Sequence, residues 1–220
     1  MKKTLMALCA VLACAVVFAQ EAAPAPASAA AQAPEMRKAP WPVWLAFNST
    51  KNIDVVGLRL TLPYGECEGV TGFDLGFYGR CRYFEGFQLN ILRNEALDVM
   101  GGVQVGLYNS AGRADLTGLQ IGLWNEARSM RGVQVGIYNS SGRADLMGLQ
   151  VGLWNEAHSI RGVQFGLINV ADSVTGIQVG IINRSEALYG FQGGIVNVIR
   201  ESEMPFCPIL NIGFDTFTEP

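Results

Sequence analysis

The 220-residue sequence has little charge and almost no histidine: 16 per cent of its residues are charged, and His158 is the only histidine. Its net charge of −3 leaves no basic excess, which excludes a nucleic-acid partner held through phosphate contacts. The sequence also lacks a phosphate-binding loop, a nucleophile–base pair and a Cys/His spacing typical of metal sites. These absences predict a protein that is not an enzyme and needs no cofactor or metal.

No apolar run is long enough to cross a membrane comfortably as a helix. The longest run near the start, residues 5–18, follows Lys2 and Lys3 and ends at a Val-Phe-Ala cleavage sequence. This arrangement predicts a signal peptide over residues 1–19. The alternative is a lipoprotein signal with its lipid on Cys14, although apolar residues continue after that cysteine. Either signal predicts an exported protein of the cell envelope, in the periplasm, the outer membrane or at the cell surface.

Large apolar side chains are scarce in residues 20–40, which consist mainly of Ala, Pro, Gln, Glu and Ser. Such a segment buries too little apolar surface to offset its ordering entropy, so a disordered linker is predicted. A β-repeat domain follows over residues 41–214, and residues 215–220 form a flexible tail. Residues 41–47 are predicted to cap the first repeat, and the proline-containing segment 206–214 to close the last one.

The repeat is an eight-residue pattern, Gly-aliphatic-Gln-aliphatic-Gly-aliphatic-x-Asn, seen most clearly at residues 102–109. Successive opening glycines stand 14 to 16 residues apart, and the ten octets begin at Gly57, Gly72, Gly86, Gly102, Gly118, Gly132, Gly148, Gly162, Gly176 and Gly190. The alternation predicts a half-buried β-strand with an aliphatic face and an opposite face of Gln and Gly.

The segments between octets repeat as well. An apolar residue always stands two positions before the opening glycine, such as Leu116, and a small one usually stands two positions after the asparagine, such as Ala111. Solvent-exposed loops have no reason to keep these features, so the connections are predicted to contribute to the core. The opening glycine would permit the positive φ or the close backbone approach that a tight corner needs.

The fold class is therefore all-β, and two architectures fit it. The favoured one is a β-solenoid of about ten repeats with capping strands at both ends, because a directional motif then meets the same surroundings in every copy. The alternative is a small up-and-down outer-membrane β-barrel. Residues 102–131 and 132–161 are near duplicates that differ at six positions. Such a unit fits a duplicated hairpin or one solenoid turn, so the number of repeats per turn stays open.

In a solenoid, identical amide side chains would stack as ladders of hydrogen bonds along the axis. The predicted ladder residues are Gln104, Gln120, Gln134, Gln150, Gln164, Gln178, Asn109, Asn125, Asn139, Asn155, Asn169 and Asn183. The Gln/Gly face is also a candidate binding surface, with Tyr108, Trp124, Tyr138 and Trp154 at its edge. The other interpretation of these rings is a stacking ladder. The partner would be a protein or glycan at the cell surface, with membrane association also consistent.

Two cysteines, Cys67 and Cys81, lie in consecutive turns, and a disulfide between them is one hypothesis; the other is two small residues in turns. His158 has Arg128 as its counterpart in the duplicate, which indicates a solvent-exposed surface side chain rather than a metal ligand or catalytic group. Six carboxylates in the turns fall at different points of the repeat and not in one cluster, which makes a glycan-acting enzyme a remote alternative. These carboxylates are Asp115, Glu126, Asp145, Glu156, Asp172 and Glu186.

The directional octet, with Val-Val-Gly-Leu-Arg-Leu at 55–60 and Pro-Ile-Leu-Asn-Ile-Gly-Phe at 208–214, resembles the bacterial surface repeat-containing protein family. The resemblance covers residues 41–214 and implies an exported protein of the envelope or cell surface. The family carries no established activity, so it implies no functional residues. The first three octets depart from the pattern at Arg59, Asp74 and Arg93, which argues against regular amide ladders there.

Overall fold

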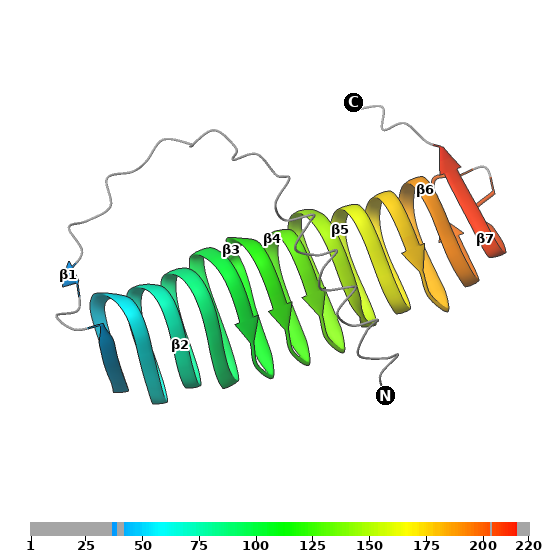
Figure 1. Cartoon of the computed structure of the whole chain (residues 1–220). Helices are drawn as coiled ribbons and strands as arrows, with labels where there is room; N and C mark the ends of the chain where they lie inside the picture. The colour runs from blue at the N-terminus through cyan, green and yellow to red at the C-terminus, as the bar shows by residue number, and fades with distance from the viewer. Residues whose placement is uncertain (1–36, 39–41, 203, 215–220) are drawn as a thin grey trace, which may run out of the picture.

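The computed structural model describes residues 37–38, 42–202 and 204–214, and it contains strands without helices in those ranges (Figure 1). The strands are wound around one axis, so that a single strand label often covers several coils. Their bounds are β1 (Arg37–Lys38), β2 (Val43–Val105), β3 (Tyr108–Ile121), β4 (Trp124–Val135), β5 (Tyr138–Val179), β6 (Ile182–Ile199) and β7 (Phe206–Phe214).

Successive octets pair in parallel, each residue beside its equivalent. Between β3 and β4, Gly118 pairs with Gly132 and Gln120 with Gln134. One octet therefore occupies each coil, which settles the number of repeats per turn at one and makes each thirty-residue duplicate two coils. The solenoid prediction is confirmed. The up-and-down barrel is wrong, because its neighbouring strands would be antiparallel.

The opening glycine of every octet has a positive φ, as predicted. At Gly132, for example, φ is 142°, and an added Cβ would lie 1.9 Å from the carbonyl oxygen of Gly118. Such a conformation and such a close backbone contact leave room only for glycine. This column of glycines lets each coil turn from the connecting segment into the octet while staying in contact with its neighbour.

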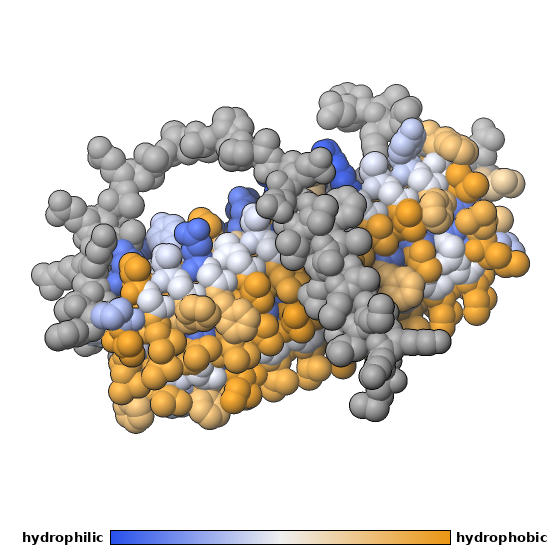
Figure 2. Space-filling model, viewed as in Figure 1, coloured by the Kyte–Doolittle hydropathy of each residue, from blue (hydrophilic) through white to orange (hydrophobic). Residues whose placement is uncertain are grey.

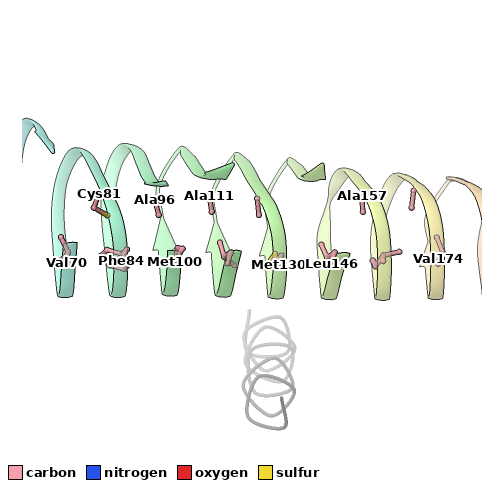
Figure 3. Packing of buried hydrophobic residues seen from close by; sticks show 14 of the residues in the cluster. Val70, Cys81, Phe84, Ala96, Met100, Ala111, Met130, Leu146, Ala157 and Val174 are labelled. Atoms are coloured by element: carbon pink, nitrogen blue, oxygen red, sulfur yellow. The ribbon is translucent and has the colours of Figure 1, made fainter. Parts of the chain in front are cut away.

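The apolar half of the interior comes from the connecting segments (Figure 3). The residue two positions before each opening glycine is buried, and so is the small residue two positions after each asparagine. Met100, Met130 and Leu146 form one labelled row and Ala96, Ala111 and Ala157 the other. The prediction that the connections contribute to the core is confirmed.

Both ends of the solenoid carry the expected capping strands. At the N-terminal end, the amide of Leu58 in the first octet donates to the carbonyl of Pro42, just before β2, at 2.7 Å. Trp44 packs partly buried against the core. At the other end, β7 runs antiparallel to β6, with Gly190 opposite Gly213. An antiparallel strand breaks the parallel stacking pattern and closes the repeat array. Figure 1 shows β7 in red at this end.

Several predictions fall outside the described residues: the signal peptide, nearly all of the linker, Trp41 and the C-terminal tail. Arg37 and Lys38, which belong to the predicted linker, instead form β1 and pair in parallel with Ile53 and Asp54 of β2.

Candidate functional site

The two faces of the octet lie opposite to the arrangement that the candidate Gln/Gly binding surface requires. The Gln and Asn side chains point into the solenoid, where Gln120 and Asn125 are fully buried, whereas Leu123 is 51% exposed. The predicted Gln/Gly binding surface is therefore wrong, because its glutamines are inaccessible to a partner. The surface that the octets do offer is aliphatic.

The glutamines form a continuous hydrogen-bonded ladder along the axis. Gln134 donates from Nε2 to Oε1 of Gln120 at 2.8 Å and to the carbonyl of Ser140 in its own coil at 3.3 Å. Gln120, Gln150, Gln164 and Gln192 make the same bond to a carbonyl of their own coil, so these amides join neighbouring coils and also brace the coil to which they belong. The ladder includes every predicted glutamine and two more: Gln88, Gln104, Gln120, Gln134, Gln150, Gln164, Gln178 and Gln192.

The asparagines form a second ladder and hold the corner of the next coil. Asn125 donates from Nδ2 to Oδ1 of Asn139 at 2.8 Å and to the carbonyl of Val135 at 2.9 Å. A Cβ at Gly136 would lie 2.5 Å from this Nδ2, so the second glycine of the octet leaves space for the amide. The ladder contains Asn94, Asn109, Asn125, Asn139, Asn155, Asn169, Asn183 and Asn197.

The third octet joins the asparagine ladder one residue later than the sequence pattern indicates. Arg93 pairs with Tyr108, while Asn94 pairs with Asn109 and donates to its Oδ1 at 2.7 Å. The expectation that Arg93 interrupts the ladder is wrong, because one additional residue in this coil brings Asn94 into the asparagine position.

In the first coils, a buried ion pair takes the place of two ladder glutamines. Arg59 and Asp74 are both fully buried, and Arg59 Nε donates to Asp74 Oδ1 at 2.8 Å. Arg59 Nη2 also donates to Asp74 Oδ2 at 2.5 Å. An added Cβ at Gly79 would lie 2.4 Å from Asp74 Oδ2, so this glycine leaves the space that the pair fills. Opposite charges at equivalent positions of adjacent octets are the signal that predicts such a pair.

Asp74 is the acceptor for the surrounding coils as well. Thr61 Oγ1 donates to it at 2.9 Å, Gln88 Nε2 at 2.8 Å and Asn90 Nδ2 at 2.9 Å. Burial would raise the pKa of Asp74, but the hydrogen bonds and charge of Arg59 outweigh it and the pKa is lowered. Burial likewise opposes the charge on Arg59, yet its bonds to Asp74 raise the pKa of the guanidinium. The pair is therefore ionised inside the solenoid, with its charges compensated.

The predicted disulfide is absent from the structure, which holds Cys67 and Cys81 as free, buried thiols in the apolar core. Cys67 Sγ accepts a hydrogen bond from Arg59 Nη1 at 2.8 Å, and Cys81 donates to the carbonyl of Glu95 at 3.7 Å. Burial raises the pKa of Cys67 to about 11, which keeps the thiol protonated at neutral pH. These residues occupy the small-residue positions of their coils.

The four predicted aromatic residues lie on the outer surface, and three of them stack. The Tyr108 and Trp124 ring centroids are 6.4 Å apart, and those of Trp124 and Tyr138 are 4.2 Å apart. Tyr108 donates from its hydroxyl to Glu126 at 2.6 Å, and burial together with this bond raises the pKa of Tyr108. Trp124 and Trp154 remain 46% and 44% exposed. The rings thus form a stack that is still accessible along one side.

The aliphatic face is the set of outward side chains at the second, fourth and sixth positions of the octets. Apart from Gly193, all of these positions hold Val, Leu, Ile or Phe. An apolar groove of about 1070 Å³ runs along the face from Ile91 to Ile181, lined by fourth- and sixth-position side chains and by the second glycine of the six octets from Gly102 to Gly176. Figure 2 shows apolar residues gathered along the lower side of the solenoid, where the arrowheads of β2, β3, β4 and β5 lie in Figure 1.

Charge is separated from this face. Between residues 57 and 197, all charged side chains lie in the connecting segments except Arg59, Asp74 and Arg93. The first two are buried, and the third lies over the ring of Tyr108 at 4.8 Å. The solenoid is therefore amphipathic across its width, with aliphatic octets on one side and charged connections on the other.

His158 lies among these connections, exposed, with its Nδ1 2.7 Å from Asp172 Oδ2. In the ranges that the structure describes, no three His, Cys, Asp or Glu side chains are grouped to hold a metal ion. Those ranges likewise contain no helix that is long and apolar enough to span a membrane.

Comparison with family models, curated proteins and solved structures gives no match to this chain.

Proposed function

We propose that this chain is a non-enzymatic scaffold of the cell envelope, exported by its N-terminal signal, that binds its partner through the aliphatic face. The observation that carries the proposal is the face itself, an uncharged apolar surface that runs along the solenoid. Soluble monomers rarely leave such a continuous patch uncovered, and larger patches mark interaction sites. The resemblance to the surface repeat-containing family supports the envelope location.

The interior supports a mechanical rather than a catalytic role. The ladder amides are bonded to one another and to backbone carbonyls, which rigidifies the coils and leaves these groups unavailable to a substrate. A rigid rod presents its outward side chains in fixed positions, and it loses little conformational entropy when a partner binds.

Cell fractionation tests both parts of the proposal. We expect the chain in the envelope fraction with its N-terminus at Gln20, as read by mass spectrometry. We expect the double variant L123D/I137D to leave that fraction, because it places two carboxylates on the apolar face.

Met147→Asp is the matched control. Met147 is 41% exposed but lies outside the aliphatic face and pairs with Arg131, so a carboxylate there meets a cation. An unprocessed chain in the cytoplasm would disprove export. Retention of L123D/I137D in the envelope at the wild-type level would disprove binding through the aliphatic face.

A further inference from the structure

We infer that a second copy of this chain covers the aliphatic face, so that two solenoids pack face to face. The inference rests on the proposed function and names the partner of that same surface. Three properties of the face support it: its area, its spacing along the axis and its lack of charge.

The area of the face is close to what a specific dimer needs. Ten octets give nine spacings of about 4.8 Å, or a length of about 43 Å, and the second to sixth positions span about 13 Å. The face thus measures roughly 560 Å² in projection and roughly 1,100 Å² for a pair, before the relief of the side chains is counted. The projected area of the pair is thus close to the lower end of specific interfaces, about 1,200 Å², and side-chain relief adds to it.

The spacing along the axis selects the partner. Side chains such as Leu123 and Ile137 stand in adjacent coils about 4.8 Å apart, and the groove beside them has the same repeat. An α-helix lying in the groove repeats every ~5.4 Å, so it would drift by half a spacing after about four turns. A second solenoid has the matching repeat over the whole length, and its sixth-position side chains fit between those facing them.

The lack of charge makes the face compatible with itself. In a symmetric pair the same patch lies on both sides of the interface. A charged residue in this patch would therefore be buried against a like charge or against apolar side chains. No second, fourth or sixth position of any octet is charged. Binding of such a face to an anionic bilayer would be strengthened by many flanking basic residues. Arg93 is the single one in the adjoining seventh-position row, and the row directly before the opening glycines holds only Arg131 and Arg161, together with Glu85.

Sedimentation of the exported chain, purified without detergent, tests the inference. We expect a dimer at micromolar concentration. We expect L123D/I137D to raise the dissociation constant of the dimer at least about a hundredfold, because each copy would bury unpaired carboxylates. M147D should dimerise as the wild type does. Both side chains of the double variant point outward, so circular dichroism should show the wild-type β spectrum.

Disulfide trapping then locates the contact. In a C207S background the buried Cys67 and Cys81 stay unreactive, and L123C or I137C, near the middle of the face, should form a covalent dimer under mild oxidation. M147C should remain monomeric. A covalent dimer through M147C but not through the face would overturn the inference.

A monomeric wild-type chain at tens of micromolar would also overturn the inference. Binding of that monomer to phosphatidylcholine vesicles, lost in L123D/I137D, would assign the face to lipid and leave the proposed function intact. If L123D/I137D changes neither self-association nor envelope retention, the inference and the proposed function both fail.

Discussion

The first coils and the later ones fill the same interior position with different chemistry. The later coils place a glutamine there, bonded to its equivalents above and below. The first two octets place Arg59 and Asp74 there, and the carboxylate collects donors from Arg59 and three neighbouring side chains. The position therefore demands matched hydrogen-bonding partners rather than one residue type.

The difference affects how each region tolerates damage. An amide ladder distributes its bonds evenly, and a lost amide leaves unpaired groups only in the adjacent coils. The charged cluster depends on a single carboxylate, and a buried guanidinium without it carries an uncompensated charge. We therefore expect the first coils to be the more fragile part of the solenoid.

Asp74→Leu should have the largest effect. It leaves Arg59 charged and buried, so we expect a loss of about 3–5 kcal/mol in the free energy of unfolding, measured with urea. The double variant R59Q/D74Q, which extends the glutamine ladder, should recover more than half of that loss. If D74L has the same free energy of unfolding as R59Q/D74Q, the ion pair does not govern the stability of these coils.

A glycine substitution tests a feature that both regions share. Gly148 has a φ of 144°, and an added Cβ would lie 2.0 Å from the carbonyl oxygen of Gly132, so Gly148→Ala should cost about 3 kcal/mol. Gly142→Ala is the control, because its Cβ would meet only Ser140 Oγ at 3.8 Å. Equal thermal stabilities of the two variants would contradict the proposed role of the glycine column.

Gln134→Leu interrupts the regular ladder in the middle. Gln120 Oε1 then loses its donor and Gln150 Nε2 keeps only the carbonyl of Glu156 as acceptor, and we expect a cost of about 2 kcal/mol, below that of D74L. Val135→Thr, an outward change beside it, should be nearly neutral by the same denaturation assay. A cost for Q134L as large as that of D74L would erase the distinction between the two regions.

The smallest effect is a pH dependence confined to the first coils. A carboxyl with a lowered pKa in the folded state stabilises the fold above its unfolded pKa, near ~4, and loses that contribution as pH falls through the folded value. Below about pH 4 the wild type should therefore lose stability faster than R59Q/D74Q. Parallel curves for the two chains in acid would show that Asp74 keeps an ordinary pKa.

The repeat predicted the solenoid because features outside the octet recurred as strictly as those within it. Residues such as Leu116 and Ala111, at constant offsets, mark core positions in the connections, and the structure buries both. The proline-bearing segment that breaks the period predicted the closing strand. The number of repeats per turn did not follow from the pattern, because a thirty-residue duplicate has the same sequence signature with either winding.

The candidate Gln/Gly binding surface was wrong because polar side chains usually lie on the solvent side of a half-buried strand. The usual rule fails here because stacking gives each buried amide a partner in the next coil, and this removes the penalty for burying it. The sequence does contain a signal: the third position is Gln from Gln88 to Gln192 without exception, whereas the second position varies among Val, Leu, Ile and Phe. A buried bonding position requires one residue type, and an outward position tolerates exchange.

Because each coil contains one octet, the length of the rod is proportional to the number of octets. Copying one thirty-residue unit, such as residues 102–131, adds two coils and lengthens the rod by about 10 Å without changing its cross-section. The aliphatic face lengthens in the same proportion. Tandem duplication therefore sets both the reach of the rod and the extent of its contact surface, so selection on repeat number alone adjusts both.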